Sequence, residues 1–279
     1  MRHLLFIIAI GLSVKGFGQN DSTVATFGSM GQTVDPLSVT RLRIANDVDL
    51  GRIDELSKFK NLEYLSLRGD RLRSLPPQLF ELERLKVLDL SDNDLDLLPE
   101  EFTNLRSLEE LYLDQALKLD FDQALAVLGG LPNLKVLSMK NDSLLVIPES
   151  IADLNRLETL DLGGNKFTEL PSGLLKLRNL KELYLDRESG LDFRSAFILL
   201  GKLPSLRILH LESNGLKVLP ETINDIHSLE VLYLNGNQLS MVDLKRNRLQ
   251  QLMLVDLEHN HVPAETLEHL ERTGVRIRF

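Results

Sequence analysis

The sequence LKVLDLSDNDL, residues 85–95, decides how most of this chain folds. Apolar and other residues alternate around Leu88 and Leu90, which is the period of a strand that points its leucines to one side. Asn93 then interrupts the strand pattern. A single segment of this kind cannot cover its own apolar face. The pattern therefore predicts that the chain repeats the segment and stacks the copies around a continuous core.

The pattern Leu-x-x-Leu-x-Leu-x-x-Asn-x-Leu recurs in register along the chain. Ten copies begin at Val39, Leu62, Leu85, Leu108, Leu134, Leu157, Leu180, Leu206, Leu229 and Leu252. Most continue with Leu-Pro-x-x-Leu, and the prolines are Pro76, Pro99, Pro148, Pro171 and Pro220. The chain thereby resembles the leucine-rich repeat family, in its bacterial and plant LPxxL class. The resemblance implies an α/β solenoid, or horseshoe, with a parallel β-sheet on the concave side and 3-10, extended or short helical segments on the convex side.

The Asn position stands where each strand ends and the chain bends away. An amide both donates and accepts hydrogen bonds, so a column of asparagines can satisfy backbone groups of adjacent turns. We interpret these residues as structural and not catalytic, with aspartate as an imperfect substitute. The predicted ladder is Asn93, Asn165, Asn214, Asn237 and Asn260, and the substitutes are Asp47, Asp70 and Asp142.

Two copies are 26 residues long instead of 23, and they resemble each other. Residues 108–133 read LEELYLDQALKLDFDQALAVLGGLPN, and residues 180–205 read LKELYLDRESGLDFRSAFILLGKLPS. The second begins 72 residues after the first and keeps its frame. This recurrence indicates that a unit of three turns was duplicated.

Each long copy lacks the proline and carries apolar residues at helical spacing instead. We expect a short convex helix in both. Asp120 is a good N-cap, with Gln123 completing a capping box. Gly129 and Gly201 stand where a left-handed residue would end each helix.

The N-terminus has the order of a secretory signal peptide. Arg2 and His3 precede an apolar run from Leu4 to Val14, and small residues lead to Gly18. We predict export of the chain with cleavage after Gly18, to the periplasm, the cell surface or the medium, and no membrane span in the mature chain. The predicted divisions are a signal peptide at 1–18, an N-terminal linker and cap with a short helix at 19–38, the repeats at 39–262 and a C-terminal cap of helix and strand at 263–279.

Composition argues against several classes of function. The chain has 41 acidic and 32 basic residues, a net charge of −9, so it would repel nucleic acid. It has no cysteine, which excludes a thiol nucleophile and a thiolate metal site, and an exported chain without disulfides fits a bacterium. No phosphate-binding loop or dinucleotide fingerprint occurs. The histidines at 259 and 261 we interpret as surface residues and not as metal ligands. We predict no catalytic residue, no cofactor and no metal.

Function in this architecture is expected on the concave face, at the outward positions of the strands. The central outward row reads Arg43, Ser66, Asp89, Tyr112, Ser138, Asp161, Tyr184, His210, Tyr233 and Asp256. All four tyrosines of the protein fall on this face, with Tyr64 one row earlier. Tyrosine gives a broad, rigid contact with a polar tip. The predicted ligand-binding residues are Tyr64, Tyr112, Tyr184, Tyr233, Asp114, Asp186, Glu212 and His210.

Simpler interpretations of these residues stay open. Tyrosine also favours strands, and a row of carboxylates can serve solubility alone. His210 lies near Tyr184 and Glu212 in the frame, which would suit an acid–base role. An open sheet, however, is not expected to exclude water or to shift pKa values as a cleft does.

The resemblance and the face together predict a monomeric, non-enzymatic binding protein that recognises a protein or a peptide. A glycan is an alternative ligand, because tyrosines beside carboxylates also suit sugars. A structural component of the cell envelope is a second alternative. An effector with ubiquitin-ligase activity is a third, but it would need a catalytic cysteine that this chain lacks. Sequence does not identify the ligand.

Overall fold

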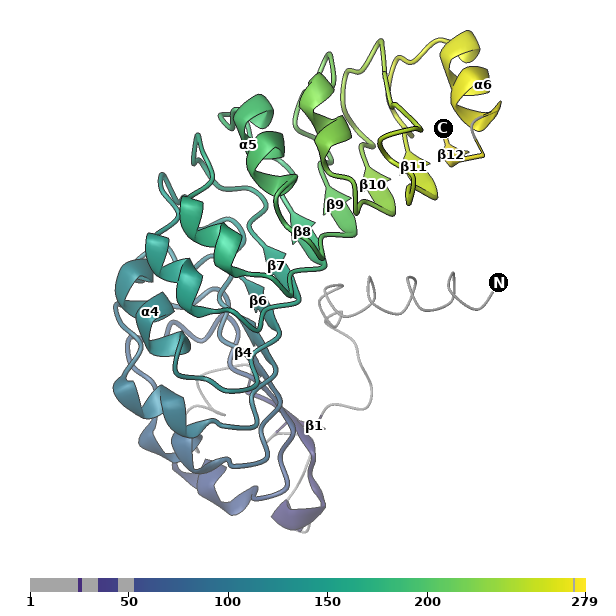
Figure 1. The fold of residues 1–279 in the computed structure, drawn as a ribbon. Coiled ribbons are helices and arrows are strands. Elements are labelled where there is room, and N and C mark those ends of the chain that lie inside the picture. The colour runs from purple at the N-terminus through teal and green to yellow at the C-terminus, as the bar shows by residue number, and fades with distance from the viewer. Residues whose placement is uncertain (1–24, 27–34, 45–52, 273) are drawn as a thin grey trace.

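The computed structural model describes residues 25–26, 35–44, 53–272 and 274–279. These residues form one twelve-stranded sheet in which the strands follow each other in sequence order and every pairing is parallel. The strands line the inner side of an arc, and the helical segments line its outer side (Figure 1). The predicted α/β solenoid with a concave parallel sheet is confirmed.

The strands are two or three residues long, because only the x-Leu-x part of each copy is extended. They are β1 (Ala25–Thr26), β2 (Arg41–Arg43), β3 (Tyr64–Ser66), β4 (Val87–Asp89), β5 (Glu110–Tyr112), β6 (Val136–Ser138), β7 (Thr159–Asp161), β8 (Glu182–Tyr184), β9 (Ile208–His210), β10 (Val231–Tyr233), β11 (Leu254–Asp256) and β12 (Arg276–Arg278). Their register is constant, so each frame position meets its equivalent in the next turn. Leu88, for example, pairs with Leu65 and with Leu111.

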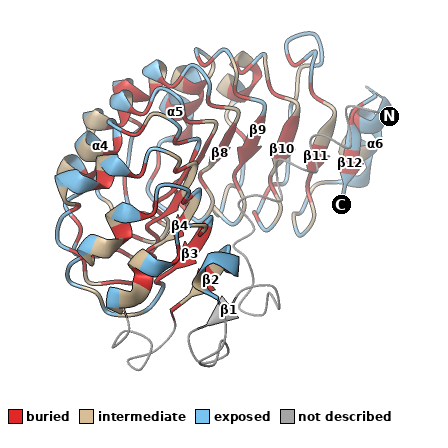
Figure 2. Ribbon diagram, turned by 90° about the horizontal axis from the view of Figure 1, so that it is seen from below, coloured by how far each residue is buried: buried red, intermediate tan, exposed pale blue. Residues whose placement is uncertain are grey.

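The repeated leucines form a continuous core inside the coil. Leu65, Leu88 and Leu111 are all 0% exposed, and the buried residues run the length of the sheet (Figure 2). Burying a leucine side chain contributes about 1.5–3 kcal/mol, so the many copies together offset the entropy of ordering the chain.

Most of the 23-residue copies cross the convex side in a short 3-10 helix. η1 (Pro36–Ser38) precedes the first copy, and the others are η2 (Ile53–Lys58), η3 (Pro77–Glu81), η4 (Glu100–Asn104), η5 (Glu149–Asp153), η6 (Ser172–Lys176) and η7 (Glu221–Asp225). A proline stands immediately before the last five: Pro76, Pro99, Pro148, Pro171 and Pro220. Proline has no backbone N–H, so it fits before a helix and not inside one.

The two 26-residue copies carry the predicted α-helices, α4 (Phe121–Leu128) and α5 (Phe193–Leu200). Asp120 caps α4, since its Oδ1 accepts from the Gln123 backbone N–H at 3.1 Å. The predicted capping box is wrong. The Gln123 side chain does not return to Asp120 but bonds the neighbouring turn, where it accepts from the N–H of Leu98 and donates to its carbonyl.

The prediction of a left-handed residue at the end of each helix is also wrong. Gly129 and Gly201 both have right-handed helical angles, with φ −56° and −61°. Their lack of a side chain serves packing instead. A Cβ on Gly201 would lie 2.8 Å from the Asp225 carbonyl oxygen, and one on Gly129 would lie 2.8 Å from the Asp153 Cβ. The glycines let neighbouring convex segments approach closely.

The ladder position joins each turn to the one before it. The Asn165 amide donates to the carbonyls of Met139 and Leu162, and its oxygen accepts from the N–H groups of Asp142 and Leu144. The Asn165 amide therefore satisfies four backbone groups in two turns. Side-chain hydrogen bonds to the backbone of neighbouring turns are made by Asn93, Asn165, Asn214, Asn237 and Asn260.

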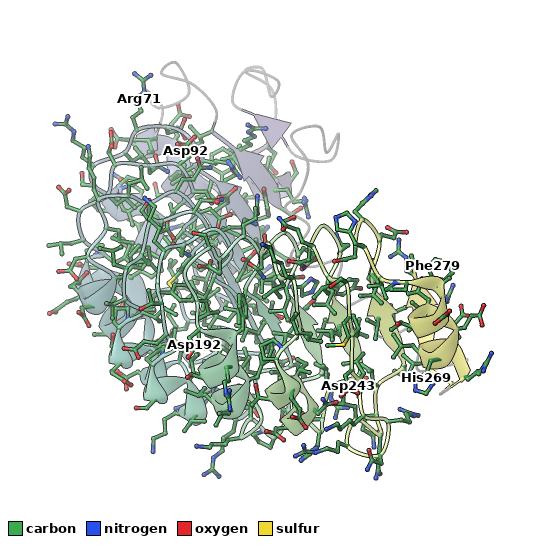
Figure 3. All side chains as sticks on the ribbon, turned by 90° about the horizontal axis from the view of Figure 1, so that it is seen from above. Arg71, Asp92, Asp192, Asp243, His269 and Phe279 are labelled. Atoms are coloured by element: carbon green, nitrogen blue, oxygen red, sulfur yellow. The ribbon has the colours of Figure 1, made fainter. Side chains whose placement is uncertain are left out.

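The residue before each ladder position bends the chain through positive φ. This holds for Gly69, Asp92, Gln115, Asn141, Gly164, Arg187, Ser213, Gly236 and His259. Six of these nine are not glycine, which strains the backbone by about 1 kcal/mol each. Asp92 lies on the loops at the N-terminal end of the arc, opposite His269 and Phe279 (Figure 3).

The two ends differ in how far the structure describes them. At the C-terminus, α6 (Ala264–Arg272) and β12 form the predicted helix and strand, and Arg276 and Arg278 are exposed along the edge. At the N-terminus, Thr26 lies in β1, where a helix was expected. The predicted signal peptide, most of the linker and Asp47 lie outside the described residues. Within the described part of the chain, no helix is both long and apolar enough to cross a membrane.

Candidate ligand-binding surface on the concave sheet

The central outward row crosses the whole sheet in register. Tyr112 of β5 pairs with Ser138 of β6, and Tyr184 of β8 pairs with His210 of β9, which pairs in turn with Tyr233 of β10. Side chains at equivalent positions of parallel strands point to the same face. These residues therefore lie side by side on the concave surface. Tyr64 stands in the neighbouring row at the start of β3.

Three rings of this row form a continuous stack. The His210 imidazole lies between Tyr184, at a ring-centroid distance of 3.7 Å, and Tyr233, at 4.5 Å. The rings are nearly parallel to it, at 10° and 15°. The spacing follows from the sheet, because neighbouring strands lie about 4.8 Å apart and each carries one ring at the same position.

Two carboxylates hold His210 from its two nitrogens. Its Nε2 lies 3.0 Å from Glu182 Oε1, and its Nδ1 lies 3.2 Å from Glu212 Oε1. The Tyr184 hydroxyl also donates to Glu182 Oε1, at 2.9 Å. Ionised carboxylates only accept hydrogen bonds, so both imidazole nitrogens act as donors and the ring is an imidazolium. We call these five residues, Glu182, Tyr184, His210, Glu212 and Tyr233, the His210 cluster.

The cluster is dry enough to shift the pKa of its histidine. Burial alone would lower the pKa of His210, but the hydrogen bonds and charges of Glu182 and Glu212 outweigh it and raise the pKa to about 9. Burial, reinforced by Glu182, raises the pKa of Tyr184 well above its usual range. The expectation that an open sheet leaves pKa values unchanged is therefore wrong here. His210 is only 8% exposed, because the neighbouring tyrosines cover both faces of its ring.

The carboxylates have more acceptor oxygens than the cluster has donors. Glu182 Oε2 and Glu212 Oε2 are both buried and have no hydrogen-bond partner. Glu182 is fully buried, whereas the Glu212 side chain is 24% exposed. An unpaired buried acceptor is costly, so two in one cluster mark an unusual site.

In the first copy of the duplicated unit, the polar side chains find their hydrogen-bond and ion-pair partners within the chain. The Tyr112 hydroxyl donates to Glu110 at 2.8 Å, as Tyr184 does to Glu182. Asp114, however, accepts from the Ser138 hydroxyl and from the Lys140 backbone N–H. The Lys140 ammonium then lies 3.8 Å from Asp114 and 3.1 Å from Asp161. Asp114 is 7% exposed and already bound to groups of the chain.

The remaining predicted residues are placed around these two centres. Asp186 lies beside β7, where Gly163 makes room for it, since a Cβ on Gly163 would fall 2.3 Å from the carboxylate. The Asp186 carboxylate forms an ion pair with Arg187, whose Nε lies 2.9 Å from Asp186 Oδ2. Tyr64 contacts the Arg41 guanidinium, whose central carbon lies 4.6 Å from the ring centroid. The structure thus gathers Tyr184, Tyr233, His210 and Glu212 and leaves Tyr64, Tyr112, Asp114 and Asp186 apart from them.

The predicted ligand-binding residues did not include Glu182 or Lys140. Glu182 stands two residues before Tyr184 on the same face, and Lys140 follows Ser138 by two. Period-two spacing alone could have placed each beside its ring or hydroxyl. The hydrogen bond from one strand to the next depends on side-chain conformations, which the frame does not contain.

Family comparison agrees with this architecture. A model described as "Leucine rich repeat" matches residues 60–116 and 178–239, and a second leucine-rich repeat model matches residues 156–177. The chain belongs to the leucine-rich repeat family. The match at residues 178–239 includes the second long copy and the strands of the His210 cluster from β8 to β10.

Curated relatives match in part of their length. Mouse podocan is 29% identical over 232 residues, which is 67% of this chain and 38% of podocan. Adenylate cyclase of Schizosaccharomyces pombe is 25% identical over 193 residues, 68% of this chain but 10% of the enzyme. The chain thus spans well under half of either relative. Because so little of the cyclase is matched, this alignment carries no enzymatic activity over to this leucine-rich repeat chain.

Solved structures share the fold. An internalin from Listeria monocytogenes has a TM-score of 0.58 at 21% identity, covering 88% of this chain and 76% of its own. The Drosophila Toll–Spätzle complex gives 0.62 at 23%, covering 86% and 33%. The ectodomain of the Arabidopsis thaliana membrane receptor kinase GASSHO1/SCHENGEN3, in complex with Casparian strip integrity factor 2, gives 0.54 at 25%, covering 86% and 29%. Two of the three are described as complexes with another protein or factor.

Among the described residues, no three or more His, Asp or Glu side chains are grouped as metal ligands. His259 and His261 are exposed on the turn after β11.

Proposed function

We propose that this protein binds another protein or a peptide along its concave face, without catalysis, and that the His210 cluster is the centre of the binding surface. The observation that carries the proposal is the stack of Tyr184, His210 and Tyr233 in one row of the sheet. Aromatic rings held rigidly beside polar groups are typical of the residues that dominate protein interfaces. Tyr184 and Tyr233 are half-buried, so each keeps surface for contact.

The stack favours a protein ligand over a glycan. Sugars bind tyrosine by lying on the face of its ring, and here the facing sides of Tyr184 and Tyr233 are covered by His210. Each tyrosine therefore keeps at most one open ring face, together with its edge. Two structures of the same fold, the Toll complex and the receptor kinase ectodomain, are described with bound partners, which supports the same class of function here.

Affinity capture tests this proposal. The protein is used as bait beside a variant with Tyr112→Ala, Tyr184→Ala and Tyr233→Ala. A control variant changes three exposed apolar residues outside the strands, Leu97→Ala, Leu145→Ala and Val218→Ala, which are 55%, 70% and 54% exposed. We expect the tyrosine variant to lose the partner and the control to keep it. A partner kept by the tyrosine variant would remove the site from the concave face.

The half-buried Tyr233 provides a milder variant, in case the triple change unfolds the chain. Tyr233→Ala alone should weaken binding by at least tenfold, which corresponds to about 1.4 kcal/mol of binding energy. Circular dichroism of each variant shows whether the fold is kept.

The setting that we propose is outside the cytoplasm of a bacterium, after removal of residues 1–18. The support is the order of charged, apolar and small residues at the N-terminus. N-terminal sequencing of the protein recovered from the periplasm and the medium tests this, and an intact Met1 in those fractions would contradict it.

A further inference from the structure

Among the described residues of the concave face, the carboxylates of the His210 cluster have no lysine or arginine partner. Resting on the proposed function, we propose that the His210 cluster selects a cation of the partner, the side chain of an arginine or lysine, and that Glu212 is its acceptor. The new element is the chemical class of the partner residue. It follows from which hydrogen-bond donors and charges are present around the cluster and which are missing.

Donors and acceptors in the cluster do not balance. His210 uses both ring nitrogens, and the Tyr184 hydroxyl is used by Glu182. Glu182 Oε2 and Glu212 Oε2 still have no partner. A ligand that fills this site must therefore bring donors. Guanidinium carries five N–H groups and ammonium three, and neither accepts, so both fit the missing role.

Glu212 is the carboxylate that a ligand can reach. Glu182 is fully buried under the stack, so its part is to fix the ring of His210. The Glu212 side chain is 24% exposed. The terminal torsion of a glutamate rotates easily, so its unpartnered oxygen can turn toward the concave space. Tyr233, which feels the charge of Glu212, stands next to it with a half-buried ring that a cation can contact.

Several other acidic or aromatic groups of this face have a lysine or arginine of the chain beside them. Arg41 lies over Tyr64, and Lys140 pairs with both Asp114 and Asp161. Asp186 has Arg187. Beyond Tyr233, Arg278 pairs with Asp256 at 3.1 Å and with Glu258 at 3.4 Å.

The His210 cluster also has one cation for two carboxylates, but that cation is a histidine, and two buried carboxylate oxygens of the cluster have no hydrogen-bond partner. Its two carboxylates share a single imidazolium, and no lysine or arginine of the described residues forms an ion pair with Glu182 or Glu212. The cations Lys140, Arg187 and Arg278 are paired with other carboxylates. The two buried oxygens of Glu182 and Glu212 that lack a partner are what a cation of the partner would match.

Titration with a matched pair of small probes tests the proposal. N-acetyl-arginine amide is added to the full chain labelled with ¹⁵N-histidine, and the ring signals of His210 are followed by NMR. N-acetyl-citrulline amide has the same shape without the charge. We expect the arginine probe to shift the His210 signals in a saturable way and the citrulline probe to bind at least tenfold more weakly.

Two variants assign the effect to Glu212. Glu212→Gln keeps the shape and removes the charge, and it should weaken the arginine probe at least tenfold. Glu258→Gln makes the same change two turns along, outside the cluster, and should leave the affinity within twofold. Equal binding of the two probes, an unchanged affinity in Glu212→Gln, or no response of His210 to arginine would each overturn the proposal.

The proposed function can survive such a failure. If capture of a partner depends on the tyrosines but the arginine probe does not bind, the concave face is still the binding site. Only the proposal that the cluster selects a cationic side chain then fails. If capture is indifferent to the tyrosines, the proposed function itself fails.

Discussion

The same five residues, Glu-Leu-Tyr-Leu-Asp, occur at 110–114 and 182–186 and form the same local structure twice. In both, the tyrosine hydroxyl donates to the glutamate two residues earlier, at 2.8 and 2.9 Å. The difference lies in the next strand. Ser138 follows the first copy and satisfies Asp114, whereas His210 follows the second and binds Glu182. The residue on the next strand therefore decides which polar groups of this five-residue segment have hydrogen-bond partners within the chain.

The charge of the next turn completes this difference. Lys140 in the first copy stands where the second has Glu212, and its ammonium pairs with two aspartates. In the first copy each oxygen of Asp114 and Asp161 thus has a partner in the chain, whereas in the second copy Glu182 and Glu212 each keep a buried oxygen without one. The two copies have the same sequence pattern. Ser138 and Lys140 in one copy correspond to His210 and Glu212 in the other, and this difference distinguishes the structural copy from the candidate site.

The largest expected effect is on folding, at the residue that differs most. His210→Ala leaves the fully buried Glu182 without its cation, and breaking a buried pair typically costs about 3–5 kcal/mol. Ser138→Ala removes one hydrogen bond from Asp114, which keeps Lys140, so its loss should be about 1 kcal/mol. Urea unfolding of the two variants measures both, and similar losses would contradict the distinction between the copies.

The second effect is the pH dependence that His210 gives to the second copy. The pKa of His210 is raised to about 9 in the folded chain, against about 6.5 unfolded. Its contribution to stability is therefore full below pH 6.5 and is lost as the pH rises through 9. The difference in unfolding free energy between the protein and His210→Gln should shrink by about 3 kcal/mol over this window.

Denaturant unfolding at pH 6, 7.5 and 9 measures that difference. Other groups that titrate in the fold are present in both proteins, so their effects cancel in it. A difference that stays constant with pH would show that His210 is not held as an imidazolium.

The ladder gives a third comparison between the copies. Asp142 in the first copy stands where the second has Asn214. Each accepts from the backbone of the previous turn, at 2.6 Å, but only Asn214 also donates, to the Leu185 carbonyl. Asp142 Oδ2 has no partner. Burial raises the pKa of Asp142 to about 8, because a protonated acid suits this position better than an anion.

Asp142→Asn should therefore stabilise the fold at alkaline pH. A raised carboxyl pKa means that stability is lost as the pH rises from about 4 to about 8, and asparagine does not titrate. We expect no more than a small change at pH 4 and a gain of about 2 kcal/mol at pH 8.5, from the restored hydrogen bond and the removed buried charge. Thermal unfolding at the two pH values checks this. A gain of the same size at both would contradict the assignment.

The smallest effect concerns the convex helices. A side chain at Gly201 would meet a backbone carbonyl oxygen, and one at Gly129 would meet a side-chain carbon, in both cases at 2.8 Å. Backbone yields less than a side chain. We expect Gly201→Ala to cost about 1 kcal/mol more than Gly129→Ala, although alanine normally favours a helix over glycine. Urea midpoints of the two variants rank them, and the reverse order would show that the second helix has room to move.

Much of the fold could be predicted from the sequence, because the repeat fixes it many times over. Leu85, Leu88 and Leu90 alternate in one copy, and equivalent residues do so in nine others, so a single period decides strands, register and core. Pro99 and its equivalents exclude a long convex helix in their copies. Asp120 predicted the start of α4 correctly.

The details that failed depend on contacts between turns. Glutamine and glycine often cap helices, but here both residues contact a neighbouring turn. The Gln123 amide bonds the backbone of Leu98, and a side chain at Gly201 would collide with the Asp225 carbonyl oxygen. Frame positions placed the tyrosines and His210 on one face, yet the hydrogen bonds to Glu182 and Glu212 are what favour the charged form of His210. Spacing predicts which residues are adjacent and does not predict how their side chains pair.

The most direct test of the central claim changes the two positions that distinguish the copies, in one copy at a time. In one variant, His210→Ser and Glu212→Lys give the second copy the residues of the first. In its counterpart, Ser138→Ala and Lys140→Gln alter the first copy alone. The affinity of each folded variant for N-acetyl-arginine amide is measured by NMR titration of tyrosine ring signals. We predict at least a tenfold loss in the first variant and less than twofold change in the second. Equal affinities in both would contradict the claim that the second copy is the binding site.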